Sequence, residues 1–109
     1  MAKKDYFVII YKILTYLYGC FQDGERPNID FFGAEALEIN KGYWVNVMES
    51  LYNEGYIMGI EFIITGSIQG VKLINLKITQ KGIEYLQENS AMTKAKDFLK
   101  AAKEIVPGL

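Results

Sequence analysis

Residues 40–57 read NKGYWVNVMESLYNEGYI, and this stretch decides the fold. Asn40 is a typical helix N-cap, because its side-chain oxygen can accept a hydrogen bond from an unpaired backbone amide of the first turn. Gly55 is expected to end the helix, since glycine adopts the left-handed conformation of a helix C-terminus at the least cost. Tyr56 and Ile57 then begin a run rich in β-branched residues. The stretch therefore predicts a helix that leads directly into a strand.

A longer helix is predicted near the start of the chain, over DYFVIIYKILTYLYGCF at residues 5–21. Its apolar residues recur at the spacing of one helix face: Tyr6, Ile9, Ile10, Ile13, Leu14, Leu17 and Phe21. The opposite side also carries Val8, Tyr11 and Tyr18. A helix that is apolar over most of its circumference is usually covered on two sides. The cover is either the rest of the domain or a second copy of the chain.

A turn and a short helix are expected between these two helices. QDGERPN, at residues 22–28, combines Asp-Gly with a proline, which is typical of a turn. A helix is then expected to start near Asp30 and to run through FFGAEAL. The chain would thus place three helices before residue 56.

The second half of the chain predicts a β-hairpin followed by two helices. YIMGIEFII and VKLINLKI are strand-like runs on either side of the glycine-bearing turn TGSIQG. Thr79 is expected to cap a helix over TQKGIEYLQEN, which ends near Asn89, with Gly82 allowing close packing. Ser90 would cap a last, amphipathic helix that ends at Ile105. Its apolar stripe is Ala91, Ala95, Phe98, Ala102 and Ile105.

This order of elements predicts an α+β fold of the winged helix-turn-helix type. Three helices are followed by a hairpin wing and a helix, and residues 90–106 form an added C-terminal amphipathic helix. With 109 residues, half of them hydrophobic, the chain is expected to form one domain over residues 1–109.

Two segments also resemble a known family. LYNEGYIMGI at residues 51–60 and LKITQKGIEYLQENSAMTKAKDFLKAAKEI at residues 76–105 are similar to the YjcQ family of small proteins from phages, prophages and Gram-positive bacteria. The resemblance is clearest over residues 44–105. EGYI and ITxKGxxYL occur in many winged helices, whereas the added C-terminal helix narrows the match. The resemblance implies a winged-helix fold and a phage or prophage setting, and it brings no activity and no site residues.

The composition argues against an enzyme. The chain has no histidine and one cysteine, Cys20, so ordinary zinc sites and histidine-activated nucleophiles cannot form. No glycine-rich phosphate loop is present. We therefore expect no catalytic residue, cofactor, metal or small-molecule substrate. A single thiol also fits a reduced, cytoplasmic setting. Residues 5–21 include Lys12 and are too short to cross a membrane, so no membrane partner is expected.

The helix over residues 40–55 presents a candidate binding face. Helical spacing assigns Trp44, Val47, Met48 and Leu51 to the core, and it turns Tyr43, Asn46, Glu49, Ser50 and Asn53 outward. Asparagine can contact adenine through two hydrogen bonds, and serine can contact a base or a phosphate. The row Tyr43, Asn46, Ser50 and Asn53 is therefore the predicted contact surface for DNA or for a protein partner.

The charge distribution opposes DNA. Residues 22–61 contain two basic side chains, Arg26 and Lys41, and eight acidic ones. Neutralising phosphates supplies much of the affinity for duplex DNA, so this region would approach DNA against its own field. From residue 62 onward there are seven lysines and four acidic residues. Lys72, Lys77 and Lys81 are candidate phosphate contacts of the wing, although exposed lysines are more often simply solvated.

Aromatic residues make up 14% of the chain, which has one Trp, eight Tyr and six Phe. Exposed aromatic side chains favour a protein partner, whereas tyrosines at a core edge would carry no such meaning. The first hypothesis is therefore a binding module for proteins, including self-association as a homodimer through the first and last helices. The alternative is a DNA-binding transcriptional regulator that uses the 40–55 helix and the wing.

Overall fold

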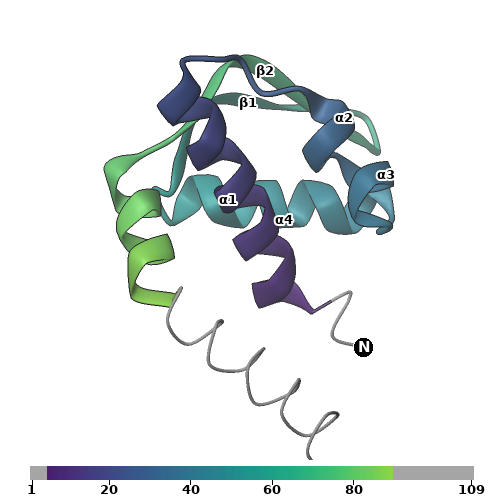
Figure 1. Cartoon of the computed structure of the whole chain (residues 1–109). Helices are drawn as coiled ribbons and strands as arrows, with labels where there is room; N and C mark the ends of the chain where they lie inside the picture. Colours follow the sequence, from purple (N-terminus) through teal and green to yellow (C-terminus); the bar gives the residue numbers. More distant parts are fainter. Residues whose placement is uncertain (1–4, 90–109) are drawn as a thin grey trace, which may run out of the picture.

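The computed structural model describes residues 5–89 and shows an α+β fold (Figure 1). Short helices and one long helix surround a central helix, and an antiparallel hairpin lies against them. The elements are α1 (Tyr6–Asp23), α2 (Ile29–Phe32), α3 (Ala34–Leu37), α4 (Lys41–Asn53), β1 (Ile57–Thr65) and β2 (Ile68–Ile78). A further helix covers residues 80–89. The predicted amphipathic helix over residues 90–106 lies outside the described residues.

Helix α1 supplies one wall of the core. Asp5 caps it, since its carboxylate accepts a hydrogen bond from the Phe7 amide at 2.9 Å. The predicted face is buried at Ile9, Ile10, Ile13, Leu14 and Leu17. Phe21, which was expected on the same face, is 50% exposed, so that prediction was wrong. The last turn of α1 borders an open groove beside β2 instead of a packed element, which explains the exposure.

The predicted helix through FFGAEAL is instead two separate turns, α2 and α3, broken at Gly33. Gly33 has extended backbone angles, φ −76° and ψ 179°, and its amide donates to the Ile29 carbonyl at 2.7 Å. A side chain at this position would press on that same carbonyl oxygen. Glu38 then ends α3 in the left-handed region, at φ 57°. In the part of the chain that the structure describes, four helices therefore precede the hairpin, not three.

Helix α4 agrees with the prediction from its sequence. The Asn40 side chain accepts a hydrogen bond from the Tyr43 amide at 2.8 Å and caps the helix. Gly55, at φ 80°, closes the end of this segment in the left-handed conformation. The expected core residues are buried, and Val45 joins them: Trp44, Val45, Val47, Met48 and Leu51. Helix α4 thus lies at the centre of the core with residues of every other element around it.

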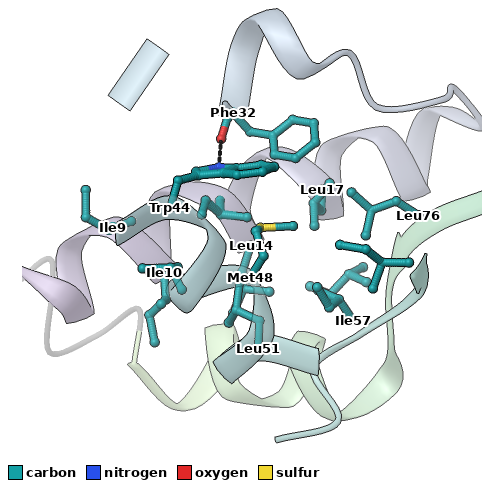
Figure 2. Close-up of a cluster of buried hydrophobic side chains, with 14 of the residues drawn as sticks. Ile9, Ile10, Leu14, Leu17, Phe32, Trp44, Met48, Leu51, Ile57 and Leu76 are labelled. Atoms are coloured by element: carbon teal, nitrogen blue, oxygen red, sulfur yellow. Dashed lines mark hydrogen bonds between the residues drawn. The ribbon is translucent and has the colours of Figure 1, made fainter. Parts of the chain in front are cut away.

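A buried hydrogen bond joins α4 to α2. The indole nitrogen of Trp44 donates to the backbone carbonyl of Phe32 at 2.9 Å, and both side chains are almost fully buried (Figure 2). The carbonyl lies near the C-terminus of a helix of only four residues, where backbone acceptors lack partners within the helix. Trp44 therefore satisfies a buried acceptor while it fills the space between the two helices.

The hairpin is closed by a two-residue turn and bent by a bulge. Gly66, at φ 64°, takes the positive angle that the first central residue of a type II′ turn requires. Between the pairs Met58–Lys77 and Ile60–Leu73, β1 has one residue and β2 has three. The one residue is Gly59, at φ 78°, and a side chain there would overlap the backbone carbonyl of Asn75. Only glycine fits where β2 bends across β1.

Thr79 fixes the junction between α4, the hairpin and the helix over residues 80–89. Its amide donates to the Tyr56 carbonyl at 3.0 Å, and its hydroxyl donates to the Gly55 carbonyl at 2.5 Å. The same hydroxyl accepts from the Gly82 amide at 3.1 Å, which confirms Thr79 as the N-cap. Gly82 is buried, and a side chain there would overlap the Tyr56 carbonyl, as its predicted role in close packing requires. This order and these contacts are compatible with a winged helix.

The Trp44–Phe32 hydrogen bond gives a first prediction. Trp44→Phe keeps an aromatic ring but leaves the Phe32 carbonyl buried without its donor, so we expect a loss of about 1–3 kcal/mol in the free energy of unfolding. Urea denaturation followed by far-UV circular dichroism measures it. Tyr52→Phe, at a position 46% exposed, is the control and should change stability by less than about 0.5 kcal/mol. Equal stability of the two variants would contradict the role of this bond.

The bulge gives a second prediction with a matched control on the same hairpin. Gly59→Ala should destabilise the fold by more than about 2 kcal/mol, because alanine is strained at positive φ and its methyl group overlaps the Asn75 backbone. Gly70→Ala, in the facing strand, meets nothing within 4 Å and should cost less than about 0.5 kcal/mol. Thermal denaturation of both variants is the measurement. Similar melting temperatures for the two would show that β2 does not cross β1 at Gly59.

Candidate binding surfaces

The four candidate contact residues of α4 differ in their exposure. Asn46 and Asn53 are exposed, as predicted. Tyr43 is half-buried and packs against the core cluster. Ser50 is also half-buried, and its backbone carbonyl accepts a hydrogen bond from the Glu54 amide at 2.9 Å. The helix therefore offers two amide side chains to solvent, with the other two members of the row closer to the core.

The exposed side of α4 is acidic. Glu49 is exposed and lies between Asn46 and Ser50 of the candidate row, and Glu54 is exposed immediately after the helix ends. Lys41, the first residue of α4, is the basic side chain of this helix and is also exposed. Carboxylates beside the asparagines repel phosphate, and at ordinary ionic strength they act over about 8–10 Å. The face that would read bases therefore lacks a cation along most of its length.

The three candidate phosphate contacts lie at three different places. Lys72 is exposed and pairs across the hairpin with Glu61, so a carboxylate lies on the same face of the sheet. Lys77 is half-buried and lines the groove beside β2. Lys81 belongs to the helix over residues 80–89, where its ammonium group lies 5.9 Å from the centre of the Tyr56 ring. None of the three lies near the turn at Gly66.

The end of the hairpin, residues 62–71, is an uncharged and apolar surface that we call the hairpin tip. Its sequence, FIITGSIQGV, contains no charged side chain. Ile63 is 47% exposed and Ile64 is 69% exposed. At its base, the Phe62 ring meets the Tyr52 ring of α4 edge-on at 5.7 Å, which connects the tip to α4. The uncharged run is visible in the sequence, where its pattern predicts only a strand and a turn.

A groove runs beside β2, and we call it the edge groove. It has a volume of about 390 Å³. One wall is made by β2 over residues 73–77, and the other by the end of α1 and the connection at residues 24–27. Sequence reasoning missed it, because it depends on how two segments some fifty residues apart lie together. The one available signal was Phe21, a large apolar residue placed beyond the buried part of α1.

A pair of tyrosines lies next to the junction formed by Thr79. The rings of Tyr56 and Tyr85 are 5.0 Å apart. Burial raises the pKa of the Tyr56 phenol above its usual value, and the carboxylates of Glu54 and Glu88 raise it further. Burial also raises the pKa of Tyr85, with a smaller contribution from Tyr56. Both phenols therefore stay protonated in the folded chain at a pH where a free tyrosine ionises.

Neither a membrane-spanning helix nor a metal-binding cluster occurs in the part of the chain that the structure describes. No helix within residues 5–89 is long and apolar enough to cross a bilayer. The same residues contain no group of three or more His, Cys, Asp or Glu side chains that could hold a metal ion.

A family model described as YjcQ protein matches residues 11–105. The chain belongs to the YjcQ family. The matched range begins inside α1 and includes α2, α3, α4 and both strands, so the described fold is that of the family region. The resemblance seen in the sequence is thereby confirmed. Comparison with curated proteins and with solved structures gives no match.

The tyrosine pair predicts how stability depends on pH. In the unfolded chain a tyrosine ionises with a pKa near 10, whereas the folded chain holds Tyr56 and Tyr85 protonated to higher pH. Their contribution is therefore complete below about pH 10 and is lost as the pH rises further. The double variant Tyr56→Phe/Tyr85→Phe should lose less stability between about pH 9 and 11 than the unchanged chain. Urea denaturation at both pH values measures the difference, and parallel declines would contradict it.

Proposed function

We propose that this member of the YjcQ family is a winged-helix binding module without enzymatic activity, and that its partner is a protein. One observation carries the proposal: the hairpin tip, the end of the predicted wing, exposes isoleucine and has no charged side chain. A wing that contacts DNA needs cations to neutralise phosphates. An exposed apolar wing matches instead the apolar centre of a protein interface.

The assignment of the wing rests on the order and contacts of the elements. Helix α4 leads into β1 through Gly55, and Thr79 binds the backbone at that connection. In a winged helix-turn-helix, α4 would be the recognition helix. Its exposed side carries Glu49, with Glu54 just beyond its end, and the hairpin tip has no charged side chain. Neither surface therefore offers phosphates an excess of cations.

Further exposed aromatic and aliphatic side chains support a protein partner. Phe7 and Phe31 are each 65% exposed, and Tyr52 is 46% exposed. Rigid aromatic side chains add contact area at low entropic cost, and they are enriched in protein interfaces. Phe7 lies on α1, so the surface of this helix remains a candidate for self-association. The last helix, its expected companion in a homodimer, lies outside the described residues.

Composition and family support a proposed setting for the module. A single cysteine, half-buried in α1, suits a reduced cytoplasm. A phage or prophage context is part of the proposal, and the family resemblance supports it. We propose that the module uses no cofactor and binds no small-molecule substrate.

A second candidate function, DNA-binding regulation, is favoured by one observation. Asn46 and Asn53 are exposed on the helix that precedes the hairpin, and asparagine can bind the major-groove edge of adenine. Base contacts by these two residues would have to form despite the repulsion between DNA phosphates and the Glu49 carboxylate on the same helix.

The two functions differ in their response to salt. Fluorescence anisotropy with a labelled duplex of about 30 base pairs, at about 50 mM salt, should show no saturable binding by the full chain at tens of micromolar. Binding that weakens steeply as salt rises, and that is lost in Asn46→Ala/Asn53→Ala, would instead establish the DNA function. Sedimentation velocity at the same concentration then tests self-association. A species larger than a monomer would identify a second copy as one partner.

A further inference from the structure

We propose that the edge groove binds an extended peptide segment of the protein partner, which adds to β2 as a third strand. The inference rests on the proposed function in requiring that the partner be a protein. It goes further in placing the contact at the edge of the sheet and in stating the chemistry of the bound segment.

The lining of the groove shows that it follows a strand edge. The edge groove is lined by residues 73–77 of β2, among them the three bulge residues 74–76, and by none of β1. Its other wall comes from the end of α1 and the connection after it. It therefore lies beside β2 on the side away from β1. Among the described residues β2 pairs with β1 only, so this edge has no partner strand.

The connection after α1 lines the far wall with residues 24–27, and among the described residues it does not pair with β2 as a strand. The Glu25 amide donates to the Cys20 carbonyl at 3.0 Å. Pro27 has no amide hydrogen. The Asn28 amide donates to the hydroxyl of Tyr16 at 2.9 Å. Of residues 25–28, only Arg26 thus has a backbone amide without a bond inside this segment or to α1.

The surface of the groove combines apolar contacts with positive charge. Leu17 and Leu76 are buried at its base, while Phe21 and Ile74 are each 50% exposed. Arg26 and Lys77 also line it, against one carboxylate from Glu25. The apolar side chains suit apolar residues of a peptide, and the excess of cations suits an acidic residue within or beside them.

The bound segment is thus an extended peptide in which apolar residues alternate with polar ones, at least one of them Asp or Glu. Backbone hydrogen bonds to β2 would supply affinity, and the alternating side chains would supply selectivity. A length of about five residues spans the described edge, since each residue of a strand advances about 3.3 Å.

Selection of a random twelve-residue peptide library on the full chain tests this inference. The enriched peptides should share alternating apolar residues and a carboxylate. In the enriched peptide that binds most tightly, each backbone amide is then methylated in turn. Methylation at every second position should weaken binding at least tenfold, whereas methylation at the positions between them should change binding little. Arg26→Glu should also weaken binding at least tenfold. The matched control is Lys12→Glu, an exposed charge reversal on α1 outside the groove.

Two results would overturn the inference. One is a loss of binding on amide methylation that does not alternate along the peptide, because strand addition uses alternate amides. The other is binding that survives Arg26→Glu and is lost in Ile63→Asp/Ile64→Asp, which would place the peptide at the hairpin tip while leaving a protein partner in place. Failure of the proposed function is a separate outcome, since it appears as salt-dependent binding of duplex DNA. Failure to enrich any peptide also counts against the groove.

Discussion

The arrangement of the helices and hairpin within residues 5–89 depends on the hydrogen bonds of one residue, Thr79. Its amide and hydroxyl bind the carbonyls of Tyr56 and Gly55, where α4 becomes β1, and its hydroxyl also caps the next helix through Gly82. The beginning and end of the hairpin are thereby tied to one point. Because those carbonyls lie past the last turn of α4, they have no partner within that helix. The same bonds satisfy them and set the direction in which the hairpin leaves the core.

The sequence predicts those elements whose signals are local. Helix α4 has a capping Asn40, a regular apolar period and Gly55 at its end, and the structure agrees at each point. The break at Gly33 and the bulge opposite Gly59 were not predicted. Glycine at either position is compatible with a regular helix or strand. A side chain is excluded at each because the fold brings a backbone carbonyl close, that of Ile29 at Gly33 and that of Asn75 at Gly59. Local propensity carries no information about such a contact.

The same limit applies to the candidate surfaces. Helical period identifies the row on α4 but leaves undetermined how deeply Tyr43 and Ser50 are covered, because that depends on neighbouring elements. The edge groove has no linear signature, since its walls come from distant parts of the chain. Charge, by contrast, is readable at once. The uncharged run at residues 62–71 and the acidic region before it are properties of the sequence that the structure places on exposed elements.

The pairing of Glu61 with Lys72 has a consequence for the chain before it is fully folded. Residues 57–65, IMGIEFIIT, combine β-branched and aromatic residues that favour intermolecular β-aggregation, and Glu61 is the one charged residue among them. During synthesis β1 emerges before β2. Until β2 is available to pair, the Glu61 carboxylate acts as a gatekeeper residue that opposes pairing of β1 with other chains. Once β2 is present, a slip of one residue would turn Glu61 toward the core. The Glu61 carboxylate thus opposes aggregation of the nascent strand and then disfavours a one-residue slip of its register.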